Sequence, residues 1–147
     1  MSTIKVDTYL TRGGASEIAI DKLKGVTAAG SMLVVGEGGT NTTNLQQGLC
    51  KAWIHLDGKG SDGVRDSFNV SGITDNGTGD YTTSFSNNLS NDDYCATGMC
   101  TFTVGATPRY RIISGYVWAT SSIRVITGYS DTNASDHAVV GINIAGD

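Results

Sequence analysis

From residue 51 onward, apolar and polar side chains alternate with a period of two, which is the pattern of β-strands that bury one face. The run KAWIHL places Ala52, Ile54 and Leu56 on one face, with Trp53 and His55 on the other. Similar runs, separated by Gly, Asn, Asp and Ser, follow at 65–70, 81–85, 99–104, 109–119, 121–129 and 137–146. Short strands with such turns predict an all-β fold, an antiparallel β-sandwich or jelly roll.

The segment RDSFNVSGITDNGTGDYTTSF, residues 65–85, predicts a hairpin that has no evident catalytic group at its turn. Asp-Asn-Gly is a strong turn signal because Asn and Gly tolerate the positive φ that tight turns require. Before the turn, Phe68 and Val70 are expected to point into the core. After the turn, Tyr81 and Phe85 are expected to point inward as well.

The first fifty residues follow a different, Gly-rich pattern. The run ASEIAIDKLKGV could form one helical turn or a short strand, and after it only residues 44–49 could form a helical turn. Such a segment is too rich in glycine to offset the entropy of its own ordering, yet too apolar to be stable in water. We therefore expect residues 1–50 to form an extended Gly-rich N-terminal arm, followed by a β-sandwich domain at 51–147. The side chains expected to bind a partner surface are Ile18, Ile20, Leu23, Val26, Met32, Leu33, Val34 and Val35.

Charge narrows the range of partners. Lys and Arg total 10 against 14 Asp and Glu, and charged residues make up 16% of the chain. Because no basic run is present to bind phosphates or an anionic bilayer, we expect neither nucleic acid nor membrane as a partner. The start MSTIKVDTYLTRGG lacks the features of a signal peptide, so synthesis in the cytoplasm is expected. A surface low in charge and rich in hydroxyl groups suits a protein that packs against other chains.

The candidates for catalysis are few. Asp75 and Asp80 flank a turn and could share a cation, but the turn chemistry of Asp, Asn and Gly explains them fully. Asp136 and His137 resemble a base with its orienting group, yet neighbours in a strand point to opposite faces. We therefore expect no enzyme activity, no cofactor and no metal site.

Three cysteines leave one question open. Cys95 and Cys100 could form a disulfide if a tight turn separates them, whereas a straight strand would place them on opposite faces. Free thiols are the expected state for a chain made under reducing conditions.

Three aromatic side chains in the predicted strands could serve either ligand binding or packing. Trp53, Tyr116 and Trp118 could form a platform on which a carbohydrate stacks, or they could pack in the core or between subunits. Packing is the more frequent use of such residues.

Residues 51–94 resemble a module of tailed-bacteriophage virion structural proteins that is usually labelled tail-fibre-like. The likeness begins with the Ala-Trp pair of KAWIHL and the small turn DGKG at 57–60. It continues through RDSFNV at 65–70 and TDNGTGDY at 74–81, and it closes with NDDY at 91–94. The opening STIKVDTYLT is also similar to the starts of many such proteins.

The resemblance implies a non-enzymatic virion component, a β-sandwich in a homotrimer, located in the virion. Two roles fit: a capsid cement (decoration) protein, or a tail fibre or tail-tip protein for host attachment. Fibres extend through repeats or triple-stranded stalks, and this chain has neither internal repeats nor heptads, so cement is favoured. The expected partners are other copies of the chain and the major capsid protein or other virion proteins. A carbohydrate-binding module is the alternative from another class.

Overall fold

The computed structural model describes residues 32–60, 63–102, 110–129 and 133–146. Its strands are β1 (Leu33–Val35), β2 (Thr42–Asn44), β3 (Cys50–Leu56), β4 (Val64–Phe68), β5 (Val70–Gly77), β6 (Asp80–Phe85), β7 (Cys95–Thr101), β8 (Arg111–Ala119), β9 (Ser122–Tyr129) and β10 (Val139–Ala145). Among these residues the one helix is α1 (Leu45–Gly48). The prediction of an all-β chain with antiparallel pairing is confirmed, since every described strand pair is antiparallel.

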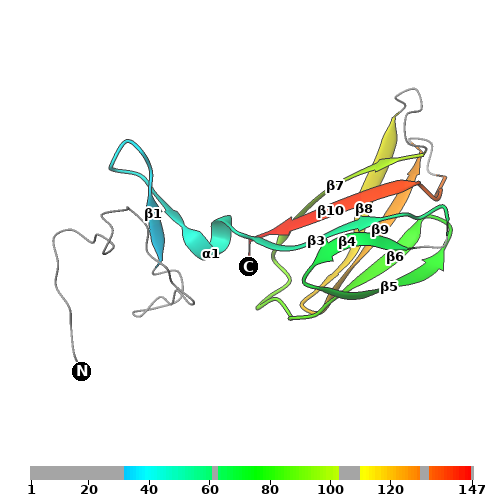
Figure 1. The fold of residues 1–147 in the computed structure, drawn as a ribbon, viewed down its shortest axis with the longest axis horizontal. Coiled ribbons are helices and arrows are strands. Elements are labelled where there is room, and N and C mark those ends of the chain that lie inside the picture. The colour runs from blue at the N-terminus through cyan, green and yellow to red at the C-terminus, as the bar shows by residue number, and fades with distance from the viewer. Residues whose placement is uncertain (1–31, 61–62, 103–109, 130–132, 147) are drawn as a thin grey trace, which may run out of the picture.

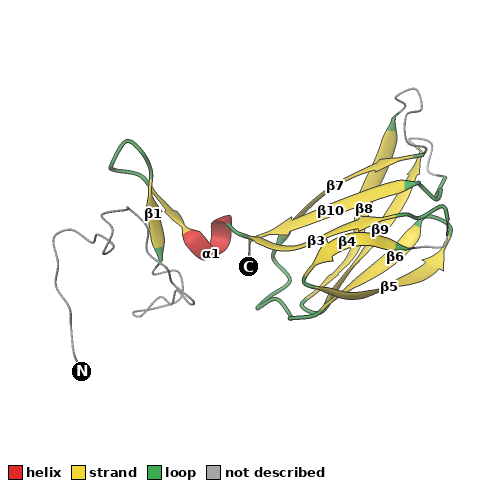
Figure 2. Cartoon of the chain, viewed as in Figure 1, coloured by secondary structure: helices red, strands yellow, loops and turns green. Residues whose placement is uncertain are grey.

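Eight strands form two sheets that lie one over the other (Figure 2). The first sheet has the order β4-β3-β10-β7, and the second has the order β5-β6-β9-β8. Three pairs of consecutive strands, β3-β4, β5-β6 and β8-β9, are neighbours within a sheet, while the other connections pass between the sheets. Strands β4 and β5 form one pair of edges, and β7 and β8 form the other.

The core lies between the two sheets and is built by the alternation that the sequence predicted. Ala52, Ile54 and Leu56 of β3 are buried, and Trp53 and His55 between them are not. The other buried apolar side chains are Tyr81, Phe85, Leu89, Tyr94, Ile123, Val125, Val140, Ile142 and Ile144. Residues from both sheets contribute to one continuous cluster. The inward orientation predicted for Tyr81 and Phe85 is therefore confirmed.

The predicted orientation of Phe68 is wrong. Residues 65–70 are not one strand, because the chain passes from the first sheet to the second at Asn69, whose φ is +56°. The Asn69 side chain holds this crossing by donating to the Lys51 carbonyl and accepting from the Asn87 amide. The period of two is broken there, so Phe68 lies on the outer face and is 53% exposed, while Val70 packs against the core.

The predicted hairpin is present as β5 and β6. In its turn, Gly77 and Gly79 have positive φ values of +135° and +68°. The Asp75 carboxylate accepts a hydrogen bond from the Gly77 amide. These contacts account for the Asp-Asn-Gly signal by backbone chemistry alone.

Among the residues that the structure describes, β1 and β2 pair only with each other, and we call residues 33–44 the ribbon. It lies beyond the ends of the two sheets and joins β3 through α1 (Figure 1). Asn44 caps α1 by accepting the Gln47 amide, which confirms the helical turn predicted at 44–49. The predicted partner-binding residues Ile18, Ile20, Leu23 and Val26 lie outside the described residues. The division into an arm and a domain stays a prediction.

Candidate functional site

The ribbon exposes apolar side chains on both of its faces. Leu33 and Val35 point to one face and Val34 to the other, and each is more than half exposed. Met32, the fourth predicted arm residue in the described region, is half-buried. The ribbon loop is closed by hydrogen bonds from the Gly36 amide to the Asn41 carbonyl and from the Gly39 amide to the Gly36 carbonyl.

A two-stranded ribbon is marginally stable in water by itself, because it buries too little apolar surface to offset its ordering. Here the β1 side chains face Thr42, Thr43 and Asn44 across the pair, which adds little apolar contact. The ribbon is therefore a surface suited to binding another apolar surface.

The outer face of the first sheet carries the second candidate surface. Phe68, Trp53, Asn143 and Thr97 form one cross-strand row over β4, β3, β10 and β7. Trp53 is half-buried and Phe68 is more than half exposed, so two aromatic rings stand beside an amide and a hydroxyl. Such a row combines apolar stacking surface with hydrogen-bonding groups.

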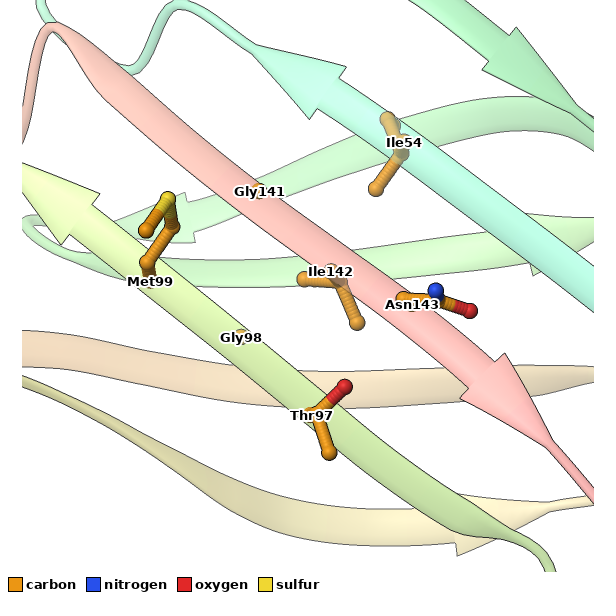
Figure 3. Close-up of a pocket in the computed structure, with 7 residues that line it drawn as sticks. All are labelled: Ile54, Thr97, Gly98, Met99, Gly141, Ile142 and Asn143. Atoms are coloured by element: carbon orange, nitrogen blue, oxygen red, sulfur yellow. The ribbon is translucent and has the colours of Figure 1, made fainter.

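A shallow hollow of about 360 Å³ lies beside this row (Figure 3). Its rim includes Thr97, Met99 and Asn143, and its floor runs along the backbone of β10 and β7. The hollow exists because Gly141 has no side chain, and a Cβ there would meet only the Met99 side chain and carbonyl at ordinary contact distances of 3.7 and 3.9 Å. The volume falls in the range of small-ligand sites.

Tyr116 lies on the outer face of the opposite sheet, 60% exposed. The Arg124 guanidinium carbon stands 4.9 Å from the centre of its ring. Arg124 also forms a two-point ion pair with Asp80 on the neighbouring strand, at 2.8 and 2.6 Å. Hydrogen bonding to Arg124 lowers the pKa of Asp80, and the pairing raises the pKa of Arg124.

Trp118 occupies a third place, on the inner side of β8 beside Ile123. A bulge between Gly115 and Val117 turns its ring over Gly115, into the mouth of a cleft between β7 and β8. Trp53, Tyr116 and Trp118 are thus distributed over two outer faces and one edge, and no common platform unites them.

The carboxylates that the sequence raised as candidates all have structural partners. Asp80 pairs with Arg124, and Asp75 accepts the Gly77 amide. Asp136 accepts hydrogen bonds from the Gly79 amide at 2.6 Å and from the Tyr81 hydroxyl at 2.8 Å.

His137 is fully buried at the end of the domain opposite the ribbon. Its Nδ1 lies 2.7 Å from the Ser135 carbonyl, so Nδ1 carries the proton and donates, and Nε2 has no partner in the described region. The ring centres of Phe102 and Tyr129 lie 6.4 and 6.1 Å from the ring centre of His137. Burial lowers the pKa of His137, and the nearby cations Lys59 and Arg111 lower it further. His137 is consequently neutral and packs as a core aromatic residue.

The three cysteines are free. Strand β7 runs straight through Cys95 and Cys100, which places them on opposite faces, as predicted for a straight strand. Cys100 faces inward opposite Val140, and burial raises the pKa of its thiol. Cys95 is exposed opposite Ala145.

Within the described ranges, His, Cys, Asp and Glu side chains form no cluster that could hold a metal ion. In the same ranges, the helix that is present is far too short to cross a bilayer. Comparison of the chain with protein-family models, with curated proteins and with solved structures found no match in any of the three.

Sequence reasoning missed two features of these surfaces, the exposure of Phe68 and the hollow over Gly141. Asn69 was a weak signal for the first, since Asn tolerates positive φ and so permits a break in a strand. The glycine in VVGINIA was a signal for the second, because a glycine in a strand has no side chain to fill the space above it.

Proposed function

We propose that this protein is a non-enzymatic structural component of a tailed-bacteriophage virion, and that it acts as a capsid cement protein. In this role the domain at 51–147 is a β-sandwich that covers the shell surface. The arm at 1–50 lies along neighbouring capsid subunits or sister copies of the chain and clamps them. The observation that carries the proposal is the ribbon, a strand pair held outside both sheets whose strand β1 exposes Leu33, Val34 and Val35.

Three further observations support the proposal. The two-layer arrangement of antiparallel strands with one shared core suits a compact cap. Asp80 and Asp136 have structural hydrogen-bond partners and His137 is packed in the core, which favours a non-enzymatic role. The likeness of residues 51–94 to phage virion modules supplies the context.

The arm provides the energy of such a clamp. Burying about 1,500 Å² per arm at roughly 25 cal/mol/Å² would give a gross gain of tens of kcal/mol, from which the cost of ordering the arm must be subtracted. Repetition over a shell multiplies whatever remains.

The experiment is gold labelling of intact particles with antibody against residues 51–147. Label spread over the whole head supports cement. Label confined to the tail end contradicts it and supports a fibre or tail-tip protein.

A variant series tests the arm on the same particles. Leu33→Asp with Val35→Asp should reduce the number of copies retained per particle, because two buried carboxylates would oppose docking. Val64→Asp, at an exposed apolar position of the domain, is the matched control and should be retained normally. Equal retention of both variants would contradict clamping by the ribbon.

The second candidate is a tail fibre or tail-tip protein that binds a glycan, and the row Phe68, Trp53, Asn143 and Thr97 beside the hollow favours it. Trp53→Ala and Phe68→Ala should then abolish glycan binding while the melting temperature changes little. Tyr116→Ala, on the other sheet, is the control. Absence of binding across a broad glycan array would remove this candidate.

A further inference from the structure

The two pairs of sheet edges differ in their chemistry. On one side, β4 and β5 carry Arg65, Asp66 and Asp75, and charge of this kind protects an edge from pairing with another chain. On the other side, the charged residue of β7 and β8 is Arg111, at the first position of β8.

The β8 edge also exposes large apolar side chains. Ile112, Tyr116, Val117 and Trp118 are each 42% to 60% exposed along one nine-residue strand. The row of backbone groups on its outer side pairs with no strand of the described region. A long, apolar, uncharged edge is the type of surface to which a further strand adds.

The same chain carries a matching pair of strands. Strand β1 is paired on one side, with β2, and its apolar side chains are uncovered. The ribbon and the β8 edge each lack apolar cover. Each carries one charged residue of opposite sign, Glu37 in the loop between β1 and β2 and Arg111 at the first position of β8. In the structure the ribbon extends beyond the ends of the sheets and pairs with no strand of the same copy's sheets (Figure 1).

We propose that the ribbon of one copy adds to the β8 edge of a second copy, extending its β5-β6-β9-β8 sheet. The inference rests on the proposed structural role, in which the arm acts between chains. The contact is head to tail, because different surfaces of the two copies meet, and such contacts close into rings when the rotation permits. The bound ribbon would cover Trp118 at the cleft between β7 and β8.

A directional cross-linking experiment tests this pairing. In a full chain with Cys50→Ser, Cys95→Ser and Cys100→Ala, single cysteines are introduced by Leu33→Cys or Val34→Cys on the ribbon, and by Ile112→Cys or Val117→Cys on β8. Leu33 and Val34 point to opposite faces, so one of them reaches the face that carries the β8 cysteine. Two purified variants are mixed and treated with a short bis-maleimide.

A ribbon variant mixed with a β8 variant should give covalent dimers, and either variant alone should give none. Dimers formed by one variant alone, or none in any mixture, would overturn the proposal.

Sedimentation velocity supplies an independent readout with the unmodified chain. The wild type should associate, and Val34→Lys or Val117→Lys should weaken association by about tenfold or more, because a lysine would be buried without a partner. Thr74→Lys, exposed on the opposite edge strand, is the matched control and should associate as the wild type does. A monomeric wild type, or equal weakening by Thr74→Lys, would contradict the assignment.

These results are independent of the particle labelling. Head labelling without cross-links would retain the cement role and overturn the ribbon pairing. Cross-links together with label at the tail would retain the ribbon pairing and overturn the cement role.

Discussion

The indole ring of Trp118 lies over Gly115, in the space that a side chain at position 115 would occupy. The bulge between Gly115 and Val117 makes this contact, and it places the ring at the mouth of the cleft between β7 and β8. Trp118 therefore closes the open side of the core while remaining 42% exposed.

Gly115→Ala should displace the Trp118 ring and destabilise the domain by about 1–3 kcal/mol, the usual cost of inserting a methyl group into a filled space. Chemical denaturation measures the loss, and a red shift of tryptophan emission reports the displaced ring. Gly141→Ala is the control, since its added methyl group would meet Met99 at ordinary contact distances. Equal losses in the two variants would contradict the role assigned to Gly115.

Gly79→Ala should be more damaging. Gly79 has φ +68°, and a Cβ there would lie 2.7 and 2.9 Å from the backbone nitrogen and oxygen of Ser135. Because backbone cannot move aside cheaply, we expect a loss above about 2 kcal/mol. Gly72→Ala, where nothing lies within 4 Å, should cost under about 1 kcal/mol. Thermal melting compares them, and a stable Gly79→Ala variant would contradict the packing at this turn.

The ion pair between Asp80 and Arg124 should stabilise the fold at neutral pH, measured as a favourable coupling energy in a double-mutant cycle with Asp80→Ala and Arg124→Ala. The folded state lowers the pKa of Asp80, so the contribution is present above the ordinary value of 3.8 and is lost as pH falls through the lowered folded value. A coupling energy of zero at neutral pH would show that Asp80 and Arg124 act independently.

His137 should make stability depend on pH. Its pKa is lowered in the folded state, so the unfolded chain binds a proton first as pH falls through about 6.5. Stability should be complete above that pH and should decline toward the lowered folded pKa, by up to about 1.4 kcal/mol per pH unit. Lys59, Arg111 and Asp136 are the charged groups that influence this site.

His137→Phe, measured by melting temperature between pH 5 and 7.5, should remove this slope. The substitution does not leave the Ser135 carbonyl without a hydrogen bond, because the Thr127 hydroxyl still donates to it. His55→Gln removes the other imidazole, from a half-exposed position, and should leave the slope in place. A wild-type profile without a slope between pH 5 and 6.5 would contradict the prediction.

The alternation of apolar residues was sufficient to predict the elements and the inner faces of β3, β6 and β10. It succeeded at Ile54 and Ile142 because strands at the centre of a sheet repeat with a period of two when one face is buried. It failed at Phe68 because one residue, Asn69, reverses the side to which later residues point, and a period carries no information about such a break.

The arrangement of the candidate sites was less accessible from the sequence. Trp53, Tyr116 and Trp118 lie on three different surfaces. Strand order separates Trp53 from the other two, and the bulge in β8 separates Tyr116 from Trp118. The alternation of apolar and polar residues assigns a side chain to one of the two faces of its strand, but it does not show to which sheet the strand belongs. The bulge that redirects Trp118 arises from the β8-β9 register, which depends on residues from both strands.

Strands β3 and β10 are antiparallel neighbours at the centre of the first sheet, so the ribbon enters the domain at the end where β10 finishes (Figure 1). The turn at Gly77–Gly79 lies at the other end, beside Asp136. The molecule thus has one pole that carries the ribbon and an opposite pole that carries this turn, separated by the length of the strands. Under the proposed cement role, in which the ribbon faces the shell, the exposed Thr78 would be among the outermost residues of every copy.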